Sequence, residues 1–238
     1  MERLLRDEIL VYLIKNKLIN PRQHGFLPKR SFYTDFSKAF DKVSHRKLLR
    51  KLKAFRIHGK TLELIRSFLI GRKQRVVLGE AVSDCGDVTS GVIQGSVLGP
   101  LLFVMYINDL FDSLNGFSLS YADDLKMMGS WKSPINKSEE LQKDLDILME
   151  WSKMWSAYLN FSKCKSMSIG HQNINDYSIN DKDENTIHIL QKTDQEKDLG
   201  IYITNNLKWR KQCTIAAAKA NRALGQIKNS KFLDIFST

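Results

Sequence analysis

FSLSYADDLKMM, residues 117–128, is the most informative stretch of the sequence, because two adjacent acids interrupt an otherwise largely apolar run. The pattern predicts a strand, an acidic turn at Asp123 and Asp124, and a second strand. Two carboxylates side by side repel each other and do not both stay ionised without a positive charge between them. Mg²⁺ is commonly held by one or two carboxylates together with substrate phosphates. The stretch therefore predicts a metal site beside a triphosphate, although adjacent acids also occur in solvated turns.

The composition is that of a globular protein with a basic N-terminal part. The chain has 238 residues, of which 42% are hydrophobic and 26% charged, enough for one large domain or two small ones. Its net charge is +11, and residues 1–80 hold 20 Lys and Arg against 7 Asp and Glu, or +13, which leaves −2 for the remainder. This asymmetry favours a nucleic-acid-binding surface over basic residues that merely keep helices soluble.

Cysteine usage and hydropathy indicate a soluble intracellular protein. Three widely spaced cysteines without a CxxC pair predict neither a disulfide framework nor a zinc site, and fit a reducing compartment: Cys85, Cys164 and Cys213. The N-terminus lacks the apolar centre of a signal peptide. The longest apolar run, Val97–Ile107, is shorter than a membrane span, so no membrane partner is expected. The sequence does not distinguish nucleus from cytoplasm, nor does it give the oligomeric state.

Hydrophobic periodicity predicts an α+β fold. Helices are predicted at 1–18, 44–57, 61–70, 100–114, 136–158 and 212–229. Hairpins are predicted at 73–88 and 117–128, short strands at 161–169, 186–190 and 198–204, and a polar loop at 173–185. The helix at 136–158 is the clearest, with a stripe predicted to be buried: Leu141, Leu145, Leu148, Trp155 and Leu159.

A second acidic cluster lies at 35–41, DFSKAFD. Asp35 is predicted to end a strand, which would bring it to Asp123 and Asp124. Three converging carboxylates would suit a two-metal site, in which one ion activates an attacking hydroxyl and the other stabilises the leaving oxygen of a phosphoryl transfer. For Asp41, a cap at the start of the next helix is favoured over metal ligation.

Five sequence motifs, in order, resemble the reverse transcriptase domain of non-LTR (LINE-type) retrotransposons. They are DFSKAFDKVSH at 35–45, SGVIQGSVLGPLLF at 90–103, YADD at 121–124, NFSKC at 160–164 and DLG at 198–200, and HGFLPKRS at 24–31 resembles the family's fingers segment. Any one of these motifs alone is weak, whereas the ordered set is specific and extends over nearly the whole chain.

The resemblance implies an α+β polymerase palm, an antiparallel sheet backed by helices at 97–114 and 136–158, with partial fingers and no complete thumb. Residues 1–34 correspond to a partial fingers segment. Residues 35–210 correspond to the palm, with a fingers insertion at about 44–90. Residues 211–238 correspond to the start of a connection to an absent thumb.

The resemblance also implies the catalytic residues. Asp35, Asp123 and Asp124 bind two Mg²⁺ ions, for which Mn²⁺ is an alternative, and Lys163 donates a proton to the departing pyrophosphate. The nucleotide-binding residues are Phe36, Phe40, Gln94 and Gly95, of which Phe40 stands where the family has the ring that excludes a 2′-hydroxyl. Leu199 and Gly200 support the primer end, and Arg75 contacts template phosphate.

The implied function is RNA-directed DNA polymerase activity, with an RNA template, a DNA primer and deoxynucleoside triphosphates as partners. Impaired activity is expected, since only three residues separate Ser31 from Asp35 and Ile93 replaces a family proline. The main alternative is a non-catalytic nucleic-acid-binding remnant of a retrotransposon. A decayed copy without function is a further alternative, and a phosphatase or phosphotransferase would leave the loop around Gln94 unexplained.

Overall fold

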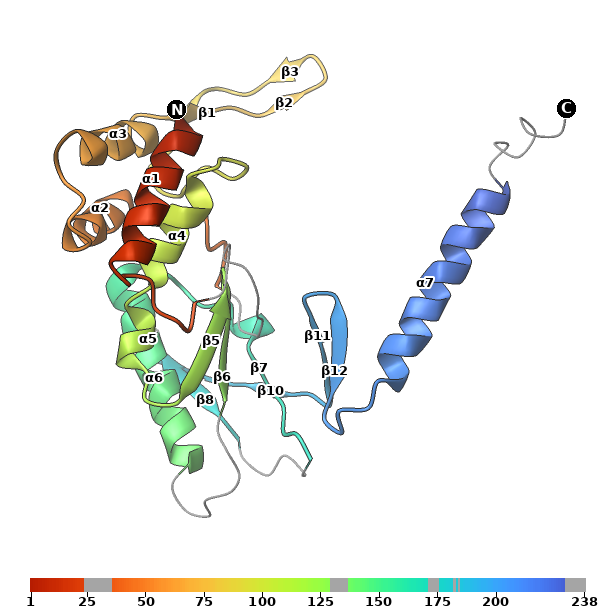
Figure 1. The fold of residues 1–238 in the computed structure, drawn as a ribbon. Coiled ribbons are helices and arrows are strands. Elements are labelled where there is room, and N and C mark those ends of the chain that lie inside the picture. The colour runs from red at the N-terminus through yellow and green to blue at the C-terminus, as the bar shows by residue number, and fades with distance from the viewer. Residues whose placement is uncertain (24–35, 129–136, 171–175, 182, 184, 230–238) are drawn as a thin grey trace, which may run out of the picture. The chain divides into compact units, whose positions relative to one another are not determined.

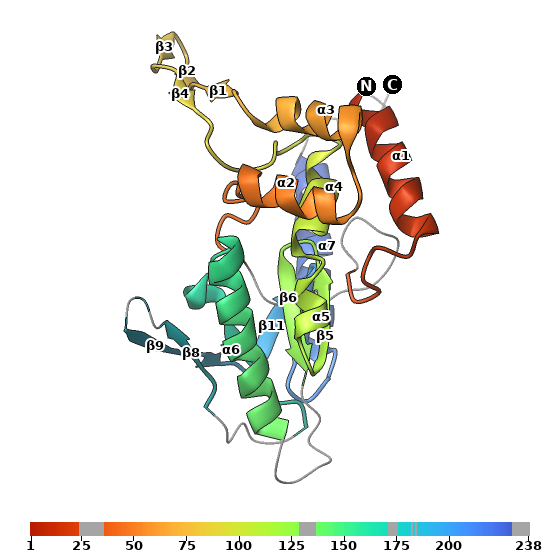
Figure 2. The same ribbon diagram turned by 90° about the vertical axis from the view of Figure 1, so that its left-hand side faces the viewer.

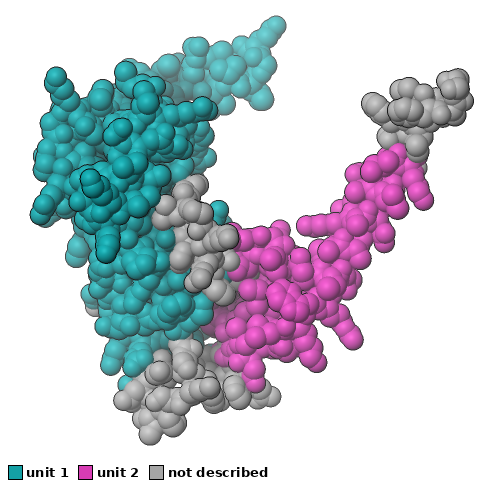
Figure 3. Space-filling view, in the orientation of Figure 1, with its two compact units in different colours: residues 1–164, 175–190 teal, residues 165–174, 191–238 magenta. Residues whose placement is uncertain are grey.

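The computed structural model describes residues 1–23, 36–128, 137–170, 176–181, 183 and 185–229. The chain forms two compact units, the first of residues 1–164 and 175–190 and the second of residues 165–174 and 191–238 (Figure 3). In the described residues, both units combine helical structure with short strand pairs, which are antiparallel except for one pair in the second unit. The predicted α+β class is therefore confirmed at the level of a mixed helix and sheet fold.

The described residues of the first unit form these α-helices (Figure 1): α1 Glu2–Lys15, α2 His45–Ala54, α3 Gly59–Leu69, α4 Gly99–Ile107, α5 Leu110–Ser113 and α6 Lys137–Trp155. Ser44 caps α2, because its hydroxyl accepts a hydrogen bond from the backbone N–H of Lys47 at 3.5 Å. The helix predicted at 100–114 is divided into α4 and α5. Within the described residues, no helix combines the length and the apolar character that a membrane crossing requires.

The strands that the structure describes in the first unit form three antiparallel arrangements. An arm beyond α3 (Figure 2) pairs β1 with β4 and β2 with β3: β1 Lys73–Gln74, β2 Val77–Leu78, β3 Ala81–Val82 and β4 Gly86–Asp87. The acidic hairpin pairs β5 Phe117–Tyr121 with β6 Asp124–Met128. The third pair is β8 Ser178–Asp181 with β9 Thr186–Ile189.

Two local predictions were wrong between residues 161 and 185. The strand expected at 161–169 begins instead with a 3₁₀ turn, η1 Phe161–Lys163. The loop expected at 173–185 contains β8, whose only apolar residue is the buried Ile179. This strand is stabilised by pairing with β9 and by Gln142 of α6, which accepts from the Ser178 N–H at 3.1 Å and donates to the Ser178 carbonyl at 2.7 Å.

Over its described residues, 165–170 and 191–229, the second unit has two strand pairs and one helix. β7 Lys165–Ser166 pairs in parallel with β10 Gln191–Lys192, and β11 Gln195–Asp198 pairs antiparallel with β12 Ile201–Thr204. The helix predicted at 212–229 is α7, Arg210–Asn229.

The core of the first unit is centred on α4, which is apolar on every side. Leu102, Met105 and Ile107 are at most 1% exposed, as expected of a helix without a polar face. The predicted stripe of α6 contributes Leu145 and Leu148 to the same core.

A buried lysine joins α2 to α4 and α6, and sequence reasoning missed it. The side chain of Lys51 is only 5% exposed, and its ammonium lies 3.7 Å from the ring centroid of Trp155 and 4.7 Å from that of Trp151. It donates to the Tyr106 carbonyl and pairs with Asp109 at 2.5 Å. Burial lowers the pKa of Lys51 from 10.5 to about 8, although the charge of Asp109 and the hydrogen bond to it act in the opposite direction.

We expect Lys51→Met to change the pH dependence of stability. Between pH 8 and pH 10.5 the unfolded chain binds more protons at Lys51 than the folded chain does, so the free energy of unfolding of the wild type rises with pH in this window. The gain is at most about 3.5 kcal/mol, since one pKa unit corresponds to about 1.4 kcal/mol. Urea unfolding of both proteins at several pH values measures the difference. If the free energy of unfolding changed with pH in the same way for the wild type and the Met variant, the prediction would be contradicted.

Candidate active site

The two adjacent acids lie at the tip of the β5–β6 hairpin. Tyr121 pairs with Asp124, so the connecting loop consists of Ala122 and Asp123 alone. Ala122 has a φ of +57°, a left-handed conformation that costs a residue with a side chain about 1–2 kcal/mol. The tight turn places the two adjacent acids, Asp123 and Asp124, at the same end of the hairpin, and both residues are half-buried.

The base of this hairpin is fixed by a buried carboxylate of α6. Asp144 is 1% exposed and accepts hydrogen bonds from the backbone N–H of Asn115 at 2.9 Å and of Gly116 at 2.7 Å. Its negative charge satisfies two donors directly before β5. Asp144 thereby sets where the hairpin begins, and its position within an amphipathic helix gave no sequence signal for this role.

An N-terminal segment adds to the other edge of β5. Gln23 forms a parallel bridge with Ser120, whose N–H donates to the Arg22 carbonyl at 3.0 Å and whose hydroxyl donates to Gln23 Oε1 at 2.8 Å. The guanidinium of Arg22 donates to the Phe111 carbonyl at 3.1 Å. Residues far apart in sequence thus meet along the strand that leads to the acidic turn.

A lysine lies beside the second acid on the same strand. Lys126 is two residues after Asp124 on β6, so both side chains leave the same face of the hairpin, and Lys126 is only 5% exposed. Burial lowers the pKa of Lys126 to about 6, and the charge of Asp124 acts in the opposite direction.

Asp35, the third predicted carboxylate, lies outside the described residues, and so does the strand expected to carry it. The neighbouring Phe36 is described: it bridges Leu159, and its side chain is 3% exposed and lies 6.3 Å from the Trp151 ring. The side chain of Phe36, predicted to bind nucleotide, is therefore in the core.

The structure brings Phe40 together with the glycine-rich loop around Gln94. The Phe40 ring stacks on Phe103 of α4, with centroids 4.8 Å apart, and its carbonyl accepts from the Val92 N–H at 2.8 Å. The Gly91 N–H donates to the Val43 carbonyl at 2.8 Å. Two motifs some fifty residues apart in sequence are therefore joined directly by backbone hydrogen bonds.

Two side chains, those of His45 and Arg72, bind the backbone of this loop, and sequence reasoning found neither. The carbonyl of Gly91 accepts from His45 Nε2 at 2.8 Å and from Arg72 Nη2 at 3.0 Å. Because a carbonyl oxygen only accepts, Nε2 of His45 must carry the proton. His45 is buried directly after the cap of α2, a position that local sequence does not distinguish from an ordinary core histidine.

The favoured interpretation of Asp41 as a helix cap was wrong. The following helix begins at His45 and is capped by Ser44, so Asp41 lies too far upstream. Its Oδ1 instead accepts a hydrogen bond from Nε2 of Gln94 at 2.9 Å. Next to Gln94, Gly95 has a φ of +80°, and a Cβ built there would meet nothing within 4 Å.

The remaining predicted site residues lie elsewhere in the fold. Lys163 is exposed at the end of η1, two residues after Phe161, whose ring stacks on that of His188 with centroids 4.1 Å apart. Leu199 and Gly200 belong to the second unit, where they form the two-residue loop between β11 and β12 with φ values of +41° and +91°. Arg75 is an exposed residue of the β1–β4 arm.

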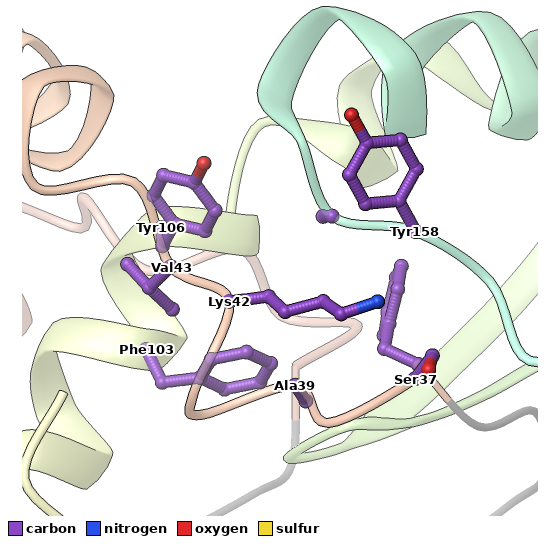
Figure 4. Close-up of a pocket in the computed structure, with 9 residues that line it drawn as sticks. Ser37, Ala39, Lys42, Val43, Phe103, Tyr106 and Tyr158 are labelled. Carbon is purple, nitrogen blue, oxygen red and sulfur yellow. The ribbon is translucent and has the colours of Figure 1, made fainter. Parts of the chain in front are cut away.

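A small pocket lies behind the segment that carries Phe40 (Figure 4), lined by Phe36, Ser37, Ala39, Lys42, Val43, Phe103, Tyr106, Ala157 and Tyr158. The Lys42 side chain extends across it, with its ammonium 5.4 Å from the Tyr158 ring centroid. The lining contains no acid and none of the predicted nucleotide-binding residues except Phe36. The pocket is therefore a gap in the packing under the site and is unsuited to a metal ion.

The acidic turn has the donors that a hard divalent ion prefers. Asp123 and Asp124 offer carboxylate oxygens, the ligands typical of Mg²⁺ and Mn²⁺. Within the part of the chain that the structure describes, no group of three or more His, Cys, Asp or Glu could hold a metal ion. Two carboxylates at one turn are chemically suited to contribute part of the ligand set of such an ion.

Comparisons with known proteins agree with the sequence motifs. Residues 9–203 match the family "Reverse transcriptase (RNA-dependent DNA polymerase)". The chain is 30% identical over 194 residues to the RNA-directed DNA polymerase from mobile element jockey of Drosophila funebris, an alignment that covers 77% of this chain and 20% of the relative. It is 32% identical over 142 residues to the probable RNA-directed DNA polymerase from transposon X-element of Drosophila melanogaster, covering 58% of this chain and 16% of the relative.

A more distant relative comes from another insect. The Pol polyprotein from type-1 retrotransposable element R2 of Popillia japonica is 28% identical over 147 residues, covering 56% of this chain and 23% of the relative. The chain thus spans about a fifth of the length of the relatives it matches. Because the family match extends over most of the chain and the relatives are polymerases of mobile elements, the predicted resemblance is confirmed: the chain belongs to the reverse transcriptase (RNA-dependent DNA polymerase) family.

Proposed function

We propose that the chain is the palm, with partial fingers, of an RNA-directed DNA polymerase. The observation that carries this proposal is that three family motifs lie in one compact unit: the acidic hairpin tip, the segment with Phe40 and Asp41, and the loop with Gln94. The last two are hydrogen-bonded to each other. In this proposal residues 35–210 form the palm, residues 1–34 and about 44–90 contribute fingers, and residues 211–238 begin the connection to a thumb.

In the proposed reaction, the primer 3′-oxygen forms a bond to the α-phosphorus of a deoxynucleotide. The bond from that phosphorus to the bridging oxygen breaks, pyrophosphate leaves, and the hydroxyl proton passes to solvent. Asp35, Asp123 and Asp124 would hold two divalent ions, which supply activation of the attacking hydroxyl and stabilisation of the leaving oxygen when bound. Lys163 would protonate the pyrophosphate.

The other predicted residues have supporting roles in this proposal. Phe40 excludes a 2′-hydroxyl, and its stacking on Phe103 supports that role because a ring packed on a buried helix yields little to a substrate. Gln94 and Gly95 border the nucleotide, and the open space at Gly95 supports a close backbone approach. Leu199, 51% exposed in a tight turn, would support the primer end together with Gly200.

Primer extension on an RNA template tests the proposal. With Mg²⁺ or Mn²⁺ we expect incorporation of deoxynucleotides and not of ribonucleotides, at a low rate because Ile93 replaces a family proline and the segment before Asp35 is short. The basic N-terminal part of the chain supports the alternative, a nucleic-acid-binding remnant, as well as it supports the polymerase. A remnant would bind the hybrid with steep salt dependence and incorporate nothing. If the chain neither binds the hybrid nor extends the primer, both functions are excluded.

A further inference from the structure

The amide of Gln94 is held in one orientation by a carboxylate 53 residues earlier in the chain. An ionised carboxylate only accepts hydrogen bonds, so the group of Gln94 that faces Asp41 must be its NH₂. The structure agrees, because Nε2 of Gln94 lies 2.9 Å from Oδ1 of Asp41. The carbonyl oxygen Oε1 of Gln94 is not used by this bond. It therefore stays available as an acceptor at the proposed nucleotide pocket.

Asp41 is itself held by its backbone. Its N–H donates to the Lys38 carbonyl at 3.0 Å, and its own carbonyl accepts from the Ser90 hydroxyl at 2.8 Å. Gly91 approaches so closely that a Cβ there would lie 2.8 Å from the Asp41 carbonyl oxygen. These contacts fix the Asp41 backbone beside the loop that carries Gln94, which places the Asp41 carboxylate within hydrogen-bonding distance of the Gln94 amide.

We propose that Asp41 is a positioning residue, which pre-orients the Gln94 side chain for an incoming nucleotide; this inference rests on the proposed function. Gln94 and Asp41 are both exposed, so their bond adds little to the stability of the fold. Without Asp41, Gln94 returns to several rotamers and must be ordered when nucleotide binds. Immobilising one such side chain lowers affinity by about two- to tenfold.

Nucleotide titrations of the full chain test the coupling. The probe is a deoxynucleoside triphosphate with Mn²⁺, measured by calorimetry with the wild type and with Asp41→Ala, Gln94→Ala, the double variant and Asp41→Asn. We expect Asp41→Ala to weaken binding about fivefold, with no further loss from Asp41→Ala in the Gln94→Ala background. Asp41→Asn should stay near the wild type, because its amide oxygen still accepts from Nε2. Additive losses in the double variant would overturn the proposal.

Ser90→Ala is the matched control for a merely structural role. It removes the hydroxyl bond to the Asp41 carbonyl and leaves the contact with Gln94 in place. Its nucleotide affinity should stay within about twofold of the wild type. An effect equal to that of Asp41→Ala would mean that the connection of the two segments matters and the orientation of Gln94 does not, which overturns the proposal.

A second readout separates this inference from the proposed function. NMR order parameters of the Gln94 side-chain amide need no substrate, and should be high in the wild type and in Asp41→Asn and fall in Asp41→Ala. If the wild type binds no nucleotide, the proposed function fails while the amide measurement still decides the coupling. An amide equally mobile in the wild type and in Asp41→Ala would reject the role of Asp41 whatever the chain binds.

Discussion

Changing Asp123 and Asp124 together to asparagine is expected to lower primer extension by on the order of 10³-fold. The amides keep the size of the carboxylates but remove two negative charges from the hairpin tip. A divalent ion in such a site supplies several kcal/mol of transition-state stabilisation, and about 1.4 kcal/mol corresponds to a tenfold change in rate. The same exchange should weaken Mn²⁺ binding, which a direct titration measures even if the wild type extends primers slowly.

A matched pair of adjacent acids serves as the control. Glu139 and Glu140 are exposed in the first turn of α6, and their change to glutamine removes the same charge from the surface. We expect this variant to keep wild-type Mn²⁺ affinity and extension. Equal Mn²⁺ affinities for the wild type and for the Asp123 and Asp124 double variant would contradict a metal site at the hairpin tip.

The acidic hairpin and α6 could be predicted from sequence because their signals are local. Apolar residues on both sides of Asp123 and Asp124 indicate two strands with a turn between them, and the spacing of Leu141, Leu145 and Leu148 has the period of a helix. Strand β8 lacks such a signal, since its formation depends on pairing with β9 and on bonds from Gln142. Local sequence does not contain those partners.

The contacts that organise the site could not be predicted either, because their partners lie far apart in sequence and meet only in the folded chain. The spacing of Lys51 from Leu48 and Leu52 places it on the buried face of α2, yet nothing nearby in sequence indicates the rings of Trp151 and Trp155. Asp41 was interpreted from its position before a helix, whereas its partner lies in the loop at Gln94. A charged residue on an apolar face is the one sequence signal here that would have justified a search for a buried partner.

Gly91→Ala is expected to destabilise the first unit by about 3 kcal/mol or more. Gly91 has a φ of +90°, and a Cβ would lie 2.8 to 3.0 Å from the carbonyl oxygen, Cα and carbonyl carbon of Asp41. These are backbone atoms, so the loop must move as a whole, which adds an overpacking cost of about 1–3 kcal/mol to the strain of the left-handed conformation. The movement would also disturb the bonds from His45 and Arg72 to the Gly91 carbonyl. Thermal or urea unfolding measures the loss.

Gly95→Ala serves as the comparison for Gly91→Ala, because a side chain at Gly91 would clash with Asp41 and one at Gly95 would not. Gly95 has a similar φ of +80°, but a Cβ there meets nothing within 4 Å, so only the conformational strain of about 1 kcal/mol is expected in the free protein. If a nucleotide approaches the Gly95 backbone closely, the added methyl group should weaken nucleotide binding more than it weakens folding. Gly91→Ala should show the reverse order, with the larger loss in stability. Equal stability losses in the two variants would mean that the contact between Gly91 and Asp41 does not hold the loop in place. The connection between the segment with Phe40 and the loop with Gln94, on which the proposed nucleotide site depends, would then lose its structural basis.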